Sequence, residues 1–157
     1  MNHDGSVIAS PEPSETRGRR PTRLYVATAF ISLFGLGDAI YLTIEHITGQ
    51  SVRCTITSGC SEVLSSTYAT IRGIPLAAIG ATAYFAVFSL ATLAAFGYRS
   101  ASWLLTLLVL GMFLVSLWLI YLQAFVIRAF CQFCLFSAAV TILITVLVVI
   151  SHRVRTE

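Results

Sequence analysis

The sequence predicts an all-α membrane protein, a bundle of four transmembrane helices with an extracytoplasmic cap loop that carries a short interfacial helix. Hydrophobic residues make up 57% of the 157 residues and charged residues only 11%, whereas a soluble domain carries about 25% charged residues. So few charges cannot cover a water-facing surface, and lipid must therefore be the solvent for most of the chain. This composition excludes a soluble enzyme, a nucleic-acid binder and a disordered regulator.

Four apolar stretches are each long enough to span a membrane, because a bilayer core of about 30 Å needs about 20 helical residues. They cover residues 24–47, 75–96, 103–127 and 133–150. We therefore expect a single transmembrane domain over residues 24–150, with an outer loop at 48–74 between the first two helices. Apolar residues at helical spacing within that loop predict the interfacial helix at residues 61–71.

Both ends of the chain are polar, and the arginines predict the orientation. Residues 1–23 are rich in Pro, Ser and Arg, which is typical of a disordered tail, and residues 151–157 form a second tail. Seven of the ten basic residues lie in these tails or between the second and third stretches: Arg17, Arg19, Arg20, Arg23, Arg99, Arg153 and Arg155. The positive-inside rule then places both tails in the cytoplasm and the outer loop on the opposite side.

The four cysteines of the chain all fall on the predicted outer side. Cys54 and Cys60 lie in the outer loop, and Cys131 and Cys134 lie where the fourth helix begins. Disulfides form and persist on this oxidising side of a membrane. The placement therefore indicates disulfide chemistry.

The Cys131-Gln132-Phe133-Cys134 motif begins a helix, which suits redox chemistry. The positive end of the helix dipole stabilises a thiolate, and residues three apart share one helix face, so the two sulfurs can form a reducible disulfide. Cys134 lies one turn deeper and could meet a lipid-soluble oxidant. A flexible loop could bring Cys54 or Cys60 to the motif, since thiol–disulfide exchange requires direct contact between sulfurs.

Two other interpretations of the cysteines remain open at this point. The first is a non-catalytic membrane scaffold or transporter subunit with two structural disulfides. The second is a zinc site with four cysteine ligands, which is less favoured because structural zinc usually stabilises small soluble modules. We expect no metal.

Several motifs together resemble the vitamin K epoxide reductase family in its bacterial form, over roughly residues 24–150. These motifs are Tyr41-Leu42-Thr43, the Cys54 to Cys60 spacing, Ser61-Glu62-Val63-Leu64-Ser65-Ser66, Gly73-Ile74-Pro75-Leu76 and the segment from Cys131 to Ala138. The resemblance implies a four-helix bundle around a quinone. The animal enzymes hold the quinone with an Asn and a Tyr near positions where this chain has Leu76 and Ser137-Ala138, so quinone reduction is expected here and epoxide reduction is not.

The resemblance also implies the reaction, that of a membrane thiol:quinone oxidoreductase. Electrons pass from an extracytoplasmic thioredoxin-like thiol oxidase through the loop pair to Cys131 and Cys134, and then to ubiquinone or menaquinone, so that exported proteins acquire disulfides. By position, Cys134 is nearest the quinone and Cys131 exchanges with either Cys54 or Cys60. The chain shows no fused thioredoxin-like domain up to Glu157, so we expect a separate partner protein. The resemblance to the bacterial form of the family implies a location in the bacterial inner membrane.

Three further polar residues could take part in quinone reduction. In the family, the segment that holds Ser65 and Ser66 helps to cap this site, and either serine could donate a hydrogen bond to a quinone oxygen, Ser66 being the better candidate. Such serines more often satisfy backbone groups. Asp38 lies within the first helix, where an ionisable group is costly and usually faces the bundle interior. It could relay a proton or bond to a neighbouring hydroxyl.

Overall fold

Four long helices dominate the computed structural model, which describes residues 14–49 and 59–156. They are α1 (Ser14–Thr48), α3 (Leu76–Ala95), α4 (Arg99–Tyr121) and α5 (Gln132–Thr156). Each contains a stretch long and apolar enough to cross a membrane. The predicted all-α bundle of four membrane helices is therefore confirmed.

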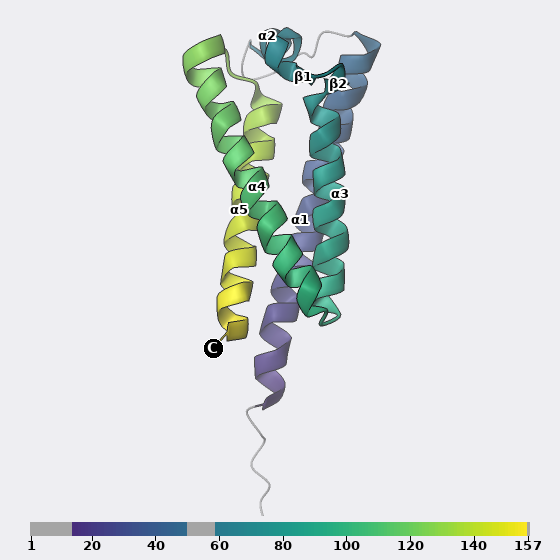
Figure 1. Ribbon diagram of the computed structural model, residues 1–157, viewed down its shortest axis with the longest axis vertical. Helices are drawn as coiled ribbons and strands as arrows, with labels where there is room; N and C mark the ends of the chain where they lie inside the picture. The colour runs from purple at the N-terminus through teal and green to yellow at the C-terminus, as the bar shows by residue number, and fades with distance from the viewer. Residues whose placement is uncertain (1–13, 50–58, 157) are drawn as a thin grey trace, which may run out of the picture.

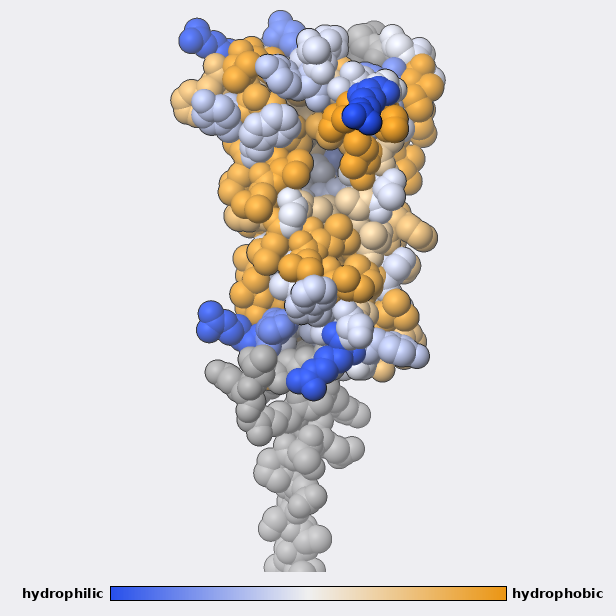
Figure 2. Space-filling view, viewed as in Figure 1, coloured by the Kyte–Doolittle hydropathy of each residue, from blue (hydrophilic) through white to orange (hydrophobic). Residues whose placement is uncertain are grey.

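The four helices run along the long axis of the molecule, with a small cap at one end (Figure 1). α1 packs mainly against α3 and also against α5, while α4 packs against both α5 and α3. The first turns of α1 and the C-terminal end of α5 lie at the end opposite the cap. Polar residues gather at the two ends, and a mostly apolar band separates them (Figure 2). This distribution suits a bundle that spans a bilayer.

The first and last helices are longer than the sequence predicts. α1 begins at Ser14 and not near residue 24, so residues 14–23 are helical where a disordered tail was expected. α5 likewise continues past residue 150 to Thr156. Once a helix has nucleated, each further residue other than proline can add a hydrogen bond at little cost, and Arg and Glu are good helix formers. Both helices can therefore extend beyond their apolar stretches.

The cap has less helix than predicted. α2 covers only Cys60–Ser65, a short 3-10 turn η1 follows at Thr67–Ala69, and β1 (Thr70–Ile71) pairs antiparallel with β2 (Ile74–Pro75). The turn residues Arg72 and Gly73 both have positive φ, at 52° and 85°, as a two-residue hairpin of this kind requires. The predicted helix at 61–71 therefore ends early, and a tight hairpin leads into α3.

A buried tyrosine joins three of the long helices. Tyr84 of α3 is 2% exposed, and its hydroxyl lies 2.8 Å from the Ser137 carbonyl oxygen and 2.9 Å from Thr141 Oγ1, both on α5. On the α1 side, a Cβ at Gly35 would overlap the Tyr84 ring. The missing side chain of Gly35 thus lets α1 approach the ring closely.

Candidate active site

Cys131 and Cys134 lie at the cap end of the bundle, where α4 turns back into α5. A π-helical turn, η2 (Leu122–Ile127), extends α4, and Arg128 then adopts a left-handed conformation with φ of 56°. Turns of π-helix are frequent at functional sites. Cys131 precedes α5 directly and Cys134 falls in its first turn. Both are free thiols.

The backbone of Cys131 is held on both sides. Its N–H donates to Oε1 of the buried Gln123 at 3.0 Å, and its carbonyl accepts from the N–H of Leu135 at 3.0 Å. The side chain of Cys131 is fully buried. A buried sulfur with so fixed a backbone has few positions available, which favours a defined exchange partner.

The two thiols differ in their hydrogen-bonding roles. The Cys134 thiol donates to the Cys131 sulfur, and this bond is the main cause that lowers the pKa of Cys131 to about 7. Burial opposes the shift, while backbone N–H groups of Cys134 and Phe133 add to it. Cys131 is therefore the sulfur that is ready to act as a thiolate nucleophile near neutral pH.

Cys60 lies in the cap next to the motif. It is fully buried and disulfide-bonded, and it packs with Cys131 in one small cluster that Val63, Leu64 and Phe133 surround. The preceding Gly59 lies so close to the turn before α5 that a Cβ there would come within 2.8 Å of the Phe130 nitrogen. The cap is thus docked against the turn that holds Cys131. Cys54 lies outside the described residues.

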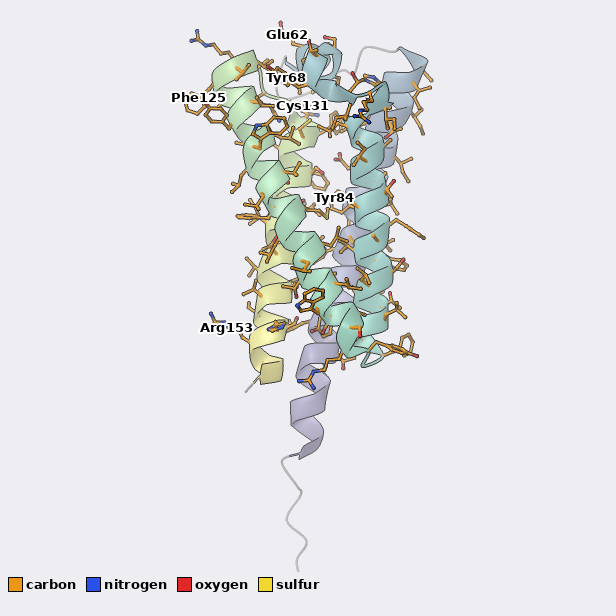
Figure 3. All side chains as sticks on the ribbon, viewed as in Figure 1. Glu62, Tyr68, Tyr84, Phe125, Cys131 and Arg153 are labelled. Carbon is orange, nitrogen blue, oxygen red and sulfur yellow. The ribbon has the colours of Figure 1, made fainter. Side chains whose placement is uncertain are left out.

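A cavity of about 480 Å³ lies beneath the cap, between the four long helices. This volume is in the range of small-molecule sites, which are mostly apolar with a few polar groups. The space-filling view shows a hollow in the cap half of the molecule, on the face where α3 and α4 diverge (Figures 1 and 2). Cys134 lines the cavity and Cys131 does not. Among the labelled residues, Tyr68 and Cys131 lie near the cap and Tyr84 lies deeper (Figure 3).

The structure separates the two candidate serines. Ser66 lines the cavity, and its hydroxyl donates to the Val63 carbonyl at 2.7 Å. Ser65 is exposed, is absent from the cavity wall, and donates to the Glu62 carbonyl at 3.3 Å. Both hydroxyls therefore satisfy backbone carbonyls, and of the two only Ser66 is placed to contact a ligand in the cavity as well.

The cavity wall also contains three residues to which the sequence assigned no definite role. Asp38 lines the cavity, and within the described part of the chain its buried Oδ2 has no hydrogen-bond partner, so the neighbouring hydroxyl considered above is not found. Gln123 and Tyr84 also line the cavity. A signal for Gln123 was present, because it is the one amide side chain in an otherwise apolar stretch. Tyr84 carries no such signal, since its contacts depend on how three helices pack.

Comparison with known families agrees with this geometry. The sequence profile described as the Vitamin K epoxide reductase family matches residues 26–149, which is most of the chain. The chain therefore belongs to this family, and membrane thiol–disulfide and quinone oxidoreductase chemistry is the kind of function it supports.

Proposed function

We propose that this member of the vitamin K epoxide reductase family is a membrane thiol:quinone oxidoreductase that supports disulfide formation in exported proteins. One observation carries the proposal. Cys134, whose thiol is hydrogen-bonded to the low-pKa Cys131, lines an apolar cavity between the four membrane helices and the cap. A lipid-soluble quinone is the kind of oxidant that such a cavity can admit from the bilayer.

The proposed reaction proceeds in three steps. A thioredoxin-like protein outside the cytoplasm reduces a disulfide between Cys54 and Cys60. The loop thiols then reduce the Cys131–Cys134 disulfide through a mixed disulfide, and the burial of Cys60 beside Cys131 supports this contact. Finally the two thiols transfer two electrons and two protons to the quinone, which leaves a disulfide and a hydroquinone.

The substrates follow from the same proposal. The quinone is ubiquinone or menaquinone, and Ser66 and Cys134 are the candidate residues to contact it; exposure of Ser65 argues for a lesser role. The thiol substrate is a separate thioredoxin-like thiol oxidase. The protein lies in a bacterial inner membrane with both termini in the cytoplasm and the cysteines outside.

The test compares two variants of the purified protein in the quinone half-reaction. Dithiothreitol, which can reduce the Cys131–Cys134 disulfide directly, serves as electron donor, and quinone consumption is followed by ultraviolet absorbance. Cys134→Ser should abolish quinone reduction. The matched control is Cys54→Ala with Cys60→Ala, which should keep quinone reduction from dithiothreitol but lose it from a reduced thioredoxin-like protein.

If Cys134→Ser reduced quinone at the rate of the wild-type protein, the proposed reaction would be refuted. A scaffold with two structural disulfides is the remaining alternative, and the position of Cys134 on the wall of the cavity argues against it. Titration in redox buffers provides an independent measurement. Structural disulfides resist reduction, so two pairs that stay oxidised under strongly reducing conditions would also refute the proposal.

A further inference from the structure

Asp38 is half-buried, and its carboxyl group has no function in the proposed reaction. With Leu42 and His46 it lines the cavity along one face of α1, at intervals of four residues. Its Oδ2 is buried, and in the described part of the chain no group donates a hydrogen bond to it. A buried polar atom without a partner destabilises the folded protein. A carboxyl group kept at that cost inside a membrane helix usually has a role.

Residues from the other three long helices surround Asp38 in the cavity. Tyr84 from α3 and Cys134 from α5 lie within electrostatic range of the carboxyl group, as does Cys131 just before α5. His46 is farther along α1 toward the cap. The Tyr84 hydroxyl is already bonded to Ser137 and Thr141. The α4 wall of the cavity is apolar except for one hydroxyl, that of Ser116.

Asp38 lies farther from the cap end of the bundle than the two sulfurs do. Asp38 lies about 10 residues, or about 15 Å of helix, from the cap end of α1, whereas Cys134 lies in the first turn of α5. Both line the same cavity. The two carbonyl oxygens of a quinone project from opposite sides of its ring. A ring seated with one oxygen near Cys134 can therefore direct the other toward Asp38.

We propose that the Asp38 carboxyl group, in its neutral acid form, hydrogen-bonds to the quinone oxygen that points away from Cys134 and donates its proton there during reduction. This inference rests on the function proposed above and adds a proton donor to it. The acid form is the expected one because an unpaired carboxylate is costly in so apolar a cavity. A quinone oxygen would also give the unpartnered carboxyl group its missing hydrogen bond.

The step balances without any further reactant. Two S–H bonds break, one S–S bond forms between Cys131 and Cys134, and two O–H bonds form on the quinone. One of those O–H protons comes from Asp38. One of the two protons released by the thiols restores the acid, so the net transfer is two electrons and two protons from the dithiol to the quinone.

The experiment measures single turnovers of pre-reduced, full-length protein with ubiquinone-1 or menadione. Asp38→Asn keeps the size and can still donate a hydrogen bond, but it cannot transfer a proton. It should bind the quinone with little change and reduce it about 100-fold more slowly, the usual range for loss of a general acid. Asp38→Glu should recover part of the rate. The matched control is Glu45→Gln, an acid on the same helix that is absent from the cavity wall, and its rate should equal that of the wild type.

Two further measurements separate proton donation from a structural effect. Reduction of the Cys131–Cys134 disulfide by dithiothreitol does not involve the quinone, so Asp38→Asn should leave its rate unchanged. Infrared difference spectra of bound menadione should show a carbonyl band lowered by hydrogen bonding in the wild type, and Asp38→Leu should lose that shift. Asp38→Asn carries the kinetic test if the leucine variant fails to fold.

The outcomes distinguish the two proposals. If the reduced wild type does not reduce either quinone, the proposed function is wrong. If the wild type does so and Asp38→Asn is within threefold of it, the role of Asp38 is wrong while the function stands. The role of Asp38 would also be overturned if Asp38→Asn slowed reduction of the Cys131–Cys134 disulfide by dithiothreitol as much as it slowed quinone reduction. A menadione carbonyl band that stays shifted in Asp38→Leu would overturn it as well.

Discussion

Cys131 and Cys134 are three residues apart, yet their environments differ. Cys131 precedes α5, is fully buried and contacts the cap, whereas Cys134 lies within the helix and lines the cavity. The hydrogen bond between them makes Cys131 the better thiolate. One sulfur thus packs against Cys60 of the cap while the other faces the cavity. The sequence could predict that these two cysteines act together, but it could not predict that Gln123 holds the backbone of Cys131, because that contact depends on the π-helical turn.

The pKa of Cys131 leads to a prediction about pH. Its thiolate should form with a midpoint of about 7, so the rate of its thiol exchange should rise with pH up to about 7 and then level off. Cys134→Ala removes the donor that contributes most to this low value, and the midpoint should move upward toward that of an ordinary thiol. Ultraviolet absorbance of the thiolate, recorded against pH, measures both midpoints.

The control for this titration is Cys131→Ala, which should lose the transition near pH 7 altogether. A midpoint that stays at about 7 in Cys134→Ala would show that the hydrogen bond from Cys134 is not the cause of the shift.

Among the structural elements, the four long helices were the most predictable. The lengths of the apolar stretches alone predict four membrane-spanning helices, because a helix much shorter than about 20 residues does not cross the hydrocarbon core. The ends of α1 and α5 were less predictable, since polar helix formers extend a helix beyond the lipid. The two-residue strands of the cap were not predicted either, because Thr70–Ile71 and Ile74–Pro75 are too short to show any alternation.

The close packing of α1, α3 and α5 gives a prediction at this scale. Gly35→Ala would place a Cβ against the buried Tyr84 ring, and overpacking of this kind costs about 1–3 kcal/mol. Its thermal midpoint in detergent should therefore fall by several degrees. Gly37→Ala is the matched control on the same helix, since the added Cβ would meet no atom within 4 Å beyond the adjoining residues and backbone of α1, and it should be neutral or slightly stabilising. Equal midpoints for the two variants would contradict this account of Gly35.

At the scale of the whole molecule, the cavity is formed jointly by all four long helices and the cap. The chain positions of its polar residues, from Asp38 to Thr141, are far apart. A single sequence can place each of them on a helix, and the family resemblance could point to Cys134 and Ser66. Neither could show that Asp38 faces the same space as Cys134, because the rotation of α1 about its axis depends on contacts such as that of Gly35 with Tyr84.

The orientation of the whole bundle in the membrane can be tested by thiol labelling. Arg153 lies at the end opposite the cap (Figure 3), and the arginine bias predicts that this end lies in the cytoplasm. In a variant without the native cysteines, Ile74→Cys and Tyr98→Cys provide single thiols at exposed positions, one in the cap and one between α3 and α4. A membrane-impermeant maleimide should label Ile74→Cys in intact spheroplasts, but Tyr98→Cys only after lysis. The reverse pattern would place the thiols in the reducing cytoplasm, where an exchange that exports disulfides could not operate.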